Sequence, residues 1–415
     1  MRNSKKITKC RLCKSKKLYQ ILGFGKVPLG NNLLSSRKLA NEVKTFNLSL
    51  IRCKICGHFQ LSDEVAPELL YATNYTYLSG VASSFVEHFE NYTTWVIKQC
   101  KLKKKDLVLD VGSNDGTCLN SFKKRNLNVL GIDPAYLPAK IANNNGINTI
   151  NKFFNSKSSI EIKENFGQVD FITSHNVLAH IGNITEVFEN IFDLLKDDGY
   201  FCFEVGYFLK VLQNNFFDTI YHEHLDYHHA SPLIKYLSNL GFSIINISTN
   251  KIQGGSIRIL CKKKNKTKIY SQPKKFLQKE KNSIINDKRY ISSWANSIYI
   301  NINKFKNLIK DYKNQKKIII GYGAPTKATL ILKISGVRYN TIAEIVEDND
   351  LKVGRYLPKT DIKICKYNKL KINKSEVIII FAWNFFSDII NKLKKDKIKN
   401  KVIISPLPEV KVYNL

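Results

Sequence analysis

The chain has 415 residues, 43% of them hydrophobic and 24% charged, which is the balance of a soluble globular protein too long for one ordinary core. No apolar run reaches the roughly 18 residues of a membrane-spanning helix, and residues 1–17 lack the apolar stretch of a secretory signal. Composition therefore excludes a membrane-embedded protein and predicts a cytoplasmic one with two or three domains.

The formal net charge of +32 raises the question of nucleic-acid binding, because polycations displace counterions from phosphate backbones. Most of the positive charge is lysine, spread along the whole chain among asparagine and isoleucine rather than gathered with arginine and aromatic residues. This diffuse pattern favours a solvated surface. We expect neither nucleic acid nor membrane as a partner.

Two Cys-x-x-Cys pairs characterise residues 1–66, a loop-rich stretch without a long helical period. Cys10 and Cys13 form one pair, and Cys53 and Cys56 form the other. Each turn directs two thiolates toward one point, and two such pairs complete a tetrahedral shell for zinc. Disulfides are disfavoured in a reducing compartment. Residues 1–66 are therefore predicted to be a zinc-binding domain with a closed, structural metal site.

Residues 67–265 alternate between runs typical of strands, such as 106–112 and 199–206, and stretches typical of helices. This alternation predicts a parallel sheet with helices on both faces. Residues 241–250 and 254–263 are expected to form an antiparallel hairpin at the edge of that sheet. Residues 266–312 should be a helical linker that packs between domains. Residues 313–415 repeat the strand-turn-helix pattern, which predicts a second Rossmann-like unit.

A tight turn follows the first strong strand of the central domain. Glycines at both ends of the segment 112–116 let the backbone approach a ligand, and such turns lie at the switch point of doubly wound sheets. The segment is neither G-x-G-x-x-G nor a P-loop, and it resembles the first motif of S-adenosylmethionine methyltransferases. One strand later, Asp133 stands where a carboxylate can accept two hydrogen bonds from ribose hydroxyls. A purely structural turn in another Rossmann-like protein remains an alternative.

As a set, the motifs resemble the sugar C-methyltransferases that act on nucleotide-bound 4-keto-6-deoxyhexoses. The order of the motifs matches that family along nearly the whole chain. They are the cysteine pairs, GSNDGT (112–117), NVLAHI (176–181), FEVGY (203–207), IYHEHLDY (220–227), GGSIR (254–258), GYGAPTKA (321–328), GRYLP (354–358) and AWNF (382–385). Two positions depart from the family pattern: Gly206 replaces a usual proline, and Asp133 replaces a frequent glutamate.

The resemblance implies an α/β protein with a small zinc-binding N-terminal domain, a central class I (Rossmann-like) methyltransferase domain and a C-terminal Rossmann-like domain. It implies a monomer with structural zinc, S-adenosyl-L-methionine as cofactor and a nucleotide sugar as substrate. The cofactor-binding residues it implies are Gly112, Ser113, Asn114, Asp115, Gly116, Asp133 and Asn176.

Methylating carbon requires a base that removes a proton next to a ketone, and histidine suits proton transfer near neutral pH. The resemblance assigns this base to His224, with Tyr221 and Glu223 lining the sugar site. It also places His180, at the end of an NVLAH strand, and a tyrosine of residues 74–80 near the substrate. Tyr75 is preferred over Tyr77 for that tyrosine. The implied product carries its new methyl group on C3, formed through an enolate. In an extended segment, His222 and His224 would point to one side, and Tyr221 and Glu223 to the other.

Other functions stay open on the sequence alone. The basic charge motivates a zinc-ribbon RNA or DNA methyltransferase, although the chain lacks an Asn-Pro-Pro-Tyr-like segment after NVLAH and a Pro-Cys nucleophile. A sugar O- or N-methyltransferase and a non-catalytic binding module are further alternatives. The histidines at 222, 224, 228 and 229 also allow a second metal site. In the C-terminal domain, Lys327 and Arg355 are candidates for phosphate contacts, with a purely structural role as the alternative.

Overall fold

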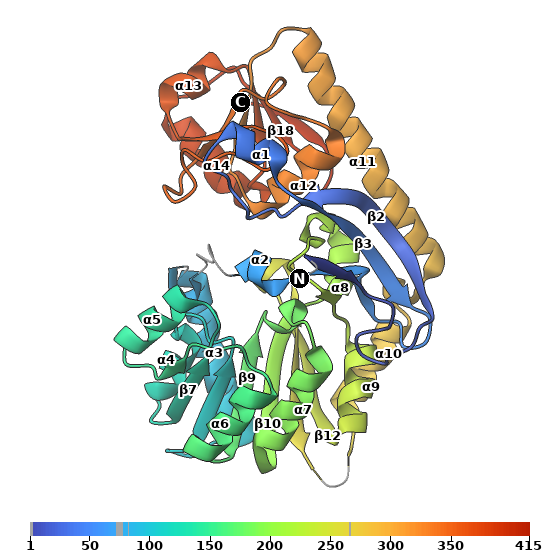
Figure 1. The fold of residues 1–415 in the computed structure, drawn as a ribbon, viewed down its shortest axis with the longest axis vertical. Helices are drawn as coiled ribbons and strands as arrows, with labels where there is room; N and C mark the ends of the chain where they lie inside the picture. The colour runs from blue at the N-terminus through green and yellow to red at the C-terminus, as the bar shows by residue number, and fades with distance from the viewer. Residues whose placement is uncertain (1–2, 72–77, 82, 265–266) are drawn as a thin grey trace.

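The computed structural model describes residues 3–71, 78–81, 83–264 and 267–415, which form three α/β parts in contact with one another (Figure 1). The small N-terminal sheet lies between the central and C-terminal parts, beside the long helix α11 (Lys288–Asn314). Within the described ranges, no helix combines the length and apolar character that crossing a membrane would require.

The N-terminal part is built on a four-stranded sheet in the order β11-β4-β3-β2. Its fourth strand comes from the middle of the chain: β11 (Asp226–Tyr227) pairs antiparallel with β4. The elements of the N-terminal part are β1 (Ser4–Lys6), β2 (Leu18–Pro28), α1 (Arg37–Glu42), β3 (Thr45–Cys53), β4 (Phe59–Leu61), β5 (Asp63–Val65) and α2 (Pro67–Tyr71). The segment that follows the YHEH motif is thus built into the N-terminal sheet.

The central part is a seven-stranded sheet in the order β12-β13-β10-β9-β6-β7-β8, with β13 antiparallel to its neighbours. The hairpin expected at the sheet edge is confirmed as β12 and β13. Alternate strand residues face α3 to α5 on one side and α6, α7 and α9 on the other, as a doubly wound sheet requires. The elements are η1 (Ser79–Val81), α3 (Ser83–Cys100), β6 (Leu107–Val111), α4 (Thr117–Lys123), β7 (Asn128–Ile132), α5 (Tyr136–Asn144), β8 (Thr149–Ile150), α6 (Ser156–Phe166), β9 (Val169–His175), η2 (Leu178–His180), α7 (Ile184–Leu194), β10 (Leu195–Gly206), α8 (Phe208–Asn214), η3 (Phe217–Thr219), α9 (Ala230–Leu240), β12 (Phe242–Asn250), η4 (Ile252–Gly254) and β13 (Ser256–Lys263).

The linker is helical, as expected, and its longest helix, α11, packs on both β2 and α12. The C-terminal sheet has the order β16-β15-β14-β17-β18-β19, parallel except for β19. The remaining elements are α10 (Ser271–Lys281), η5 (Ile284–Asn286), α11 (Lys288–Asn314), β14 (Ile319–Tyr322), α12 (Thr326–Ser335), β15 (Glu344–Glu347), β16 (Lys363–Lys366), α13 (Lys369–Lys374), β17 (Val377–Ile380), η6 (Trp383–Phe385), α14 (Phe386–Lys395), β18 (Val402–Ser405) and β19 (Lys411–Asn414).

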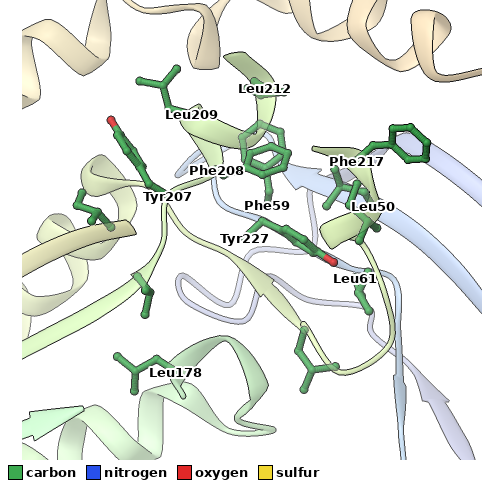
Figure 2. Close-up of a cluster of buried hydrophobic side chains, with 14 of the residues drawn as sticks. Leu50, Phe59, Leu61, Leu178, Tyr207, Phe208, Leu209, Leu212, Phe217 and Tyr227 are labelled. Atoms are coloured by element: carbon green, nitrogen blue, oxygen red, sulfur yellow. The ribbon is translucent and has the colours of Figure 1, made fainter. Parts of the chain in front are cut away.

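One continuous apolar core joins the three parts. Figure 2 shows its portion between the N-terminal sheet and α8, where Phe59 of β4 packs on Phe208 with ring centroids 4.6 Å apart. Tyr227 of β11 packs on the same Phe208 ring, at 5.5 Å. Burying a large aromatic side chain contributes roughly 2–3 kcal/mol. The strand that continues from the YHEH motif is therefore fixed by packing as well as by strand pairing.

Candidate active site

A cavity of about 720 Å³ lies where the three parts meet. The central part contributes the turn after β6 and the YHEH segment, the N-terminal part contributes Asn31, and the C-terminal part contributes Lys352 and Arg355. This volume is typical of pockets that enclose small organic ligands. The cavity therefore brings the predicted cofactor and substrate residues to one place.

The turn after β6 forms one wall of the cavity. Gly112 has a φ of +78°, and a Cβ there would lie 2.2 Å from Cγ2 of Val177, so only glycine fits this position. The carboxylate of Asp133 accepts hydrogen bonds from the backbone N–H of Asn114 at 2.9 Å and of Ala135 at 2.8 Å. A carboxylate has about four acceptor sites, so Asp133 retains acceptors toward the cavity that it lines. This arrangement fits the ribose of a nucleoside cofactor.

The predicted cofactor residues divide into two groups. Gly112, Ser113, Asn114, Asp133 and Asn176 line the cavity. Asp115 instead accepts hydrogen bonds from the Thr117 hydroxyl at 2.6 Å and the Gly80 backbone N–H at 2.8 Å, and Gly116 caps α4. These last two residues hold the shape of the turn.

Asp110, one of the residues that line this wall, was missed by the sequence reasoning. Its side chain is buried, and its Oδ1 atom has no hydrogen-bond partner among the described residues. Burial, together with nearby Asp133, raises the pKa of Asp110 to about 8. An ammonium group in the cavity would satisfy this carboxyl. The signal in the sequence is an acidic residue inside the apolar run LVLDV.

The YHEH segment forms the opposite wall, and its conformation differs from the extended one considered above. Residues 221–223 form a turn in which the backbone N–H of His224 donates to the Tyr221 carbonyl at 3.0 Å. This turn brings Tyr221 and His224 together, since residues three apart in a turn lie on the same side. His222 points elsewhere, with its Nε2 atom 3.3 Å from the Phe46 carbonyl oxygen.

His224 is held in one tautomer. Its Nδ1–H donates to the Thr219 carbonyl at 2.9 Å, and the Tyr221 hydroxyl lies 2.9 Å from its Nε2. Because a carbonyl can only accept, the proton resides on Nδ1, and Nε2 carries the basic lone pair. Burial, with a contribution from nearby His180, lowers the pKa of His224 well below its ordinary value. His224 is thus a neutral proton acceptor at the cavity wall.

His180 and Glu223 complete this wall. The NVLAH segment is not a strand, because β9 ends at His175 and residues 178–180 form a short 3-10 helix. This helix places the His180 ring 4.8 Å from that of His224, and its Nδ1–H donates to the Glu223 carbonyl at 2.9 Å. Burial lowers the pKa of His180 to about 4 and raises the pKa of Glu223 to about 7. Tyr75 and Tyr77 lie outside the described residues.

Asn31 connects all three parts at the cavity. Its amide donates to the Glu223 carboxylate at 2.8 Å, and its carbonyl oxygen accepts from the Thr326 hydroxyl. Lys327, considered above for phosphate, instead pairs with buried Asp218 at 3.1 Å. Trp383 donates to the same carboxylate at 2.8 Å. The GYGAPTKA and AWNF motifs therefore hold the segment directly before YHEH in place through Asp218. Arg355, the other candidate for a phosphate contact, lines the cavity.

The four predicted metal ligands come together in the N-terminal part. The Sγ atoms of Cys10, Cys13, Cys53 and Cys56 all lie within 4.8 Å of one another. In a ZnS₄ tetrahedron with Zn–S bonds of about 2.3 Å, sulfur atoms stand about 3.8 Å apart, and the two closest pairs here are at 3.5 Å. The set fits zinc without a ligand from elsewhere. Among the residues that the structure describes, this is the one such cluster, so the histidines near 224 do not form a second one.

Comparisons with known proteins agree with this architecture. Residues 251–408 match the C-methyltransferase C-terminal domain, residues 87–247 match a methyltransferase domain, and residues 10–71 match a domain family named for zinc binding. The C-methyltransferase NovU of Streptomyces niveus is 28% identical over 409 residues, which span 98% of this chain and 97% of NovU.

The chain is also similar to solved structures of methyltransferases over less than half of its length. Magnesium protoporphyrin IX methyltransferase of Synechocystis PCC 6803, solved with bound S-adenosylmethionine, is 13% identical with a TM-score of 0.34, covering 43% of this chain and 79% of that one. An S-adenosylmethionine-dependent methyltransferase of Clostridium acetobutylicum is 16% identical with a TM-score of 0.35, covering 43% and 92%. Matches to zinc-binding, methyltransferase and C-methyltransferase domain models thus follow one another along the chain, and together with the full-length similarity to NovU they support an S-adenosylmethionine-dependent C-methyltransferase.

Proposed function

We propose that this C-methyltransferase methylates C3 of a nucleotide-linked 4-keto-6-deoxy sugar, with His224 as the base that forms an enolate. The observation that carries the proposal is the placement of His224, whose neutral ring lines the cavity that also contains the cofactor turn and whose Nε2 accepts a hydrogen bond from the Tyr221 hydroxyl. A buried neutral imidazole suits removal of a carbon-bound proton next to a carbonyl group.

The residues of the two walls have separate roles in this reaction. Residues 112–114, Asp133 and Asn176 would hold S-adenosylmethionine, which would supply an electrophilic methyl group, and Asp110 would accept its ammonium group. His224 accepts the C3 proton at Nε2 while the electron pair of the C–H bond enters the enolate. We assign the donor to the developing C4 oxyanion to Tyr75, from outside the described residues, because the one N–H of neutral His180 already donates to the Glu223 carbonyl. The enolate carbon would then take this methyl group, with the methyl–sulfur bond breaking as the new C–C bond forms and S-adenosylhomocysteine leaving as a neutral thioether, and His224 would release its proton to solvent.

The polar lining of the cavity supports a nucleotide sugar. Glu223 and Asn31 offer acceptors and donors to sugar hydroxyls beside the base. Arg355 and Lys352 line the same cavity from the C-terminal part and supply positive charge for a diphosphate, although the Lys352 ammonium also donates to the Ala324 carbonyl at 3.0 Å. By contrast, the backbone N–H of Ala324 in the GYGAPT turn already donates to Glu347 at 2.8 Å. We therefore place the diphosphate at Lys352 and Arg355 rather than on that turn.

The proposal is tested with methyl-labelled S-adenosylmethionine and a panel of nucleoside-diphosphate 4-keto-6-deoxyhexoses in deuterated buffer. Mass spectrometry should show one added methyl group on carbon, and the enzyme alone should exchange the C3 proton of the accepted sugar. His224→Asn should abolish both while leaving cofactor binding intact. His222→Asn is the matched control, since that buried ring lies two residues away and contacts the Phe46 carbonyl. Methylation on oxygen or nitrogen, or turnover by His224→Asn, would overturn the proposal.

A further inference from the structure

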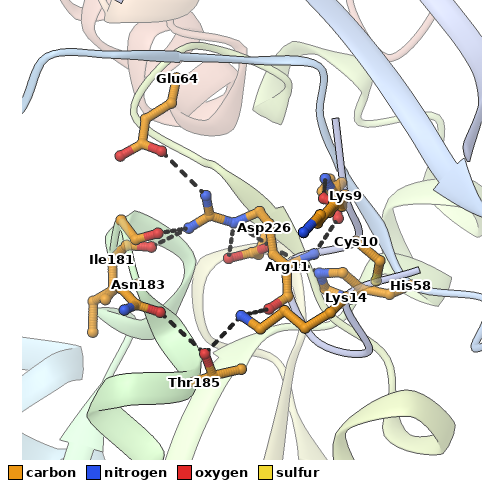
Figure 3. A network of polar contacts seen from close by, with 12 residues as sticks. Lys9, Cys10, Arg11, Lys14, His58, Glu64, Ile181, Asn183, Thr185 and Asp226 are labelled. Atoms are coloured by element: carbon orange, nitrogen blue, oxygen red, sulfur yellow. Dashed lines mark hydrogen bonds and ion pairs between the residues drawn. The ribbon is translucent and has the colours of Figure 1, made fainter. Parts of the chain in front are cut away.

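Arg11 lies between the two cysteines of the first zinc knuckle, but its side chain extends away from them (Figure 3). The Arg11 side chain is 5% exposed, and its Nε–H is shared between the two carboxylate oxygens of Asp226, at 2.9 and 3.0 Å. It also donates to the backbone carbonyls of Ile181 and Gly182, the latter at 2.8 Å. Glu64 lies 3.5 Å from its remaining nitrogen. Every side of this buried cation is thus engaged.

The partners of Arg11 belong to the two segments that carry His180 and His224. Ile181 directly follows His180, and Asp226 comes two residues after His224. A backbone hydrogen bond from Leu225 to the Ala179 carbonyl, 2.7 Å long, joins the same two segments. One guanidinium group therefore fixes the distance between the loops whose rings lie 4.8 Å apart in the cavity.

The second cysteine knuckle reaches the same carboxylate. His58, two residues after Cys56, places its Nε2 atom 2.8 Å from Asp226, and both side chains are fully buried. The backbone N–H of Arg11 donates to Gln60 of β4 at 2.8 Å, the residue that pairs with Asp226 in the sheet. Removing one partner from a buried ion pair is costly because the other charge loses its compensation. Asp226 thus depends on both knuckles.

We infer that Arg11 is a positioning residue, through which the zinc-binding knuckles set the relative placement of His180 and His224. The inference rests on the proposed role of His224 as the base. Arginine suits the task because its planar group offers five donors in a fixed geometry, enough for one carboxylate and two carbonyls together. Lysine could keep the charge next to Asp226 but not this set of directions.

Arg52 provides a matched control. It directly precedes Cys53, as Arg11 directly follows Cys10, and it is 6% exposed against 7% for Arg11. Its donors go to the Gly57 carbonyl at 3.2 Å and to Asn286 of the linker at 3.0 Å. A conservative change at either arginine disturbs a buried cation beside a metal ligand, but only the change at Arg11 alters contacts with the catalytic loops.

The experiment compares Arg11→Lys with Arg52→Lys in the full-length protein. Zinc content, melting temperature and the Kd for S-adenosylmethionine are measured first, followed by ¹⁵N spectra of labelled histidine rings with His224 assigned through His224→Asn. We expect both variants to keep zinc and cofactor binding. The His180 and His224 ring signals should move in Arg11→Lys only, and kcat on the accepted keto sugar should fall about 10- to 100-fold with KM changed less than about threefold.

Unchanged ring signals in Arg11→Lys, or a kcat equal to that of Arg52→Lys, would overturn the inference. Loss of zinc from Arg11→Lys would also overturn it, because Arg11 would then serve the cysteine cluster itself. The double variant Arg11→Met/Asp226→Asn removes both charges of the ion pair. It therefore leaves no buried charge without its partner, which could itself cause misfolding. If the wild-type protein methylates no sugar of the panel, the proposed function fails, while the ring signals still test Arg11.

Discussion

The Tyr221 hydroxyl lies 2.9 Å from Nε2 of His224, the atom that accepts the sugar proton in the reaction we propose. Since Nδ1 of His224 is occupied by its bond to the Thr219 carbonyl, Tyr221 is the donor in this contact. The Tyr221 hydroxyl orients the His224 ring, and its hydrogen bond also occupies the Nε2 lone pair that would accept the substrate proton. The two residues should therefore differ sharply in how much catalysis depends on them.

We expect Tyr221→Phe to retain measurable activity, with kcat reduced about tenfold, because the variant removes one orienting hydrogen bond but keeps the ring and the base. His224→Asn should show no turnover. Steady-state kinetics on the sugar accepted in the panel, with deuterium exchange at C3 as a second measurement, separates the two variants. Equal and complete loss in Tyr221→Phe would show that the phenol itself carries the proton.

Asp133→Asn should weaken binding of S-adenosylmethionine about 10- to 100-fold, because one carboxylate oxygen that can serve the ribose becomes an amide donor. Asp115→Asn is the informative comparison, since Asp115 accepts hydrogen bonds from Thr117 at the start of α4 and from Gly80 in η1. That variant should lower the melting temperature more than the affinity. Isothermal titration calorimetry with each variant tests this difference, and equal losses of affinity would mean that Asp115 also reaches the cofactor.

The protein should lose stability as the pH falls from 6.5 toward 5. Burial lowers the pKa of five histidines, so the unfolded chain binds protons near its ordinary histidine pKa while the folded chain does not. These residues are His175, His180, His222, His224 and His228. Asp110 and Glu223 act in the opposite direction, because their raised pKa values, about 8 and about 7, keep protons on the folded state.

Because the histidines outnumber the two carboxyl groups, the free energy of unfolding should fall by roughly 3 kcal/mol per pH unit between pH 6 and pH 5. Urea unfolding of the cofactor-free protein at several pH values measures this slope. A stability that stays constant or rises toward pH 5 would contradict burial of these rings in the neutral state.

Elemental analysis should find one zinc per chain, and Cys13→Ser should reduce that content and lower the melting temperature by several degrees, since a structural zinc site contributes directly to folding. Cys13 is the exposed member of the cluster. Cys365→Ser is the control, because Cys365 is partly exposed on β16 in the C-terminal part. A zinc content insensitive to Cys13→Ser would exclude the four-cysteine site.

Local sequence patterns were sufficient for the three-part α/β organisation, the zinc ligands and the edge hairpin. Apolar runs and Cys-x-x-Cys spacing extend over a few residues, so they can be recognised in the sequence before the fold is known. These local patterns did not predict the conformation of the YHEH segment, because the same four polar residues are compatible with a turn and with an extended segment. The turn is fixed by the local hydrogen bond from His224 to the Thr219 carbonyl and by the pairing of β11 with β4, and this strand pairing is a tertiary contact.

Contacts between distant residues set the other limit on what the sequence could predict. Arg11 and Asp226 are 215 positions apart, and no periodicity links them. Lys327 suited a phosphate contact by its place in a turn before a helix, yet it pairs with Asp218, 109 positions earlier. The role of Asp110 could not be predicted because it depends on a carboxyl oxygen that has no hydrogen-bond partner among the described residues and lies at the cavity. Each of these depends on which strands become neighbours.

The pairing of β11 with β4 makes the boundary between the first two domains a poor place to cut the chain. A fragment starting at residue 67 would leave Asp226 buried without Arg11 and His58, and would strip Phe59 from the Phe208 and Tyr227 rings. Such a fragment would aggregate rather than report on methyl transfer. Gene fusions and domain exchanges between relatives should therefore carry both segments from one parent.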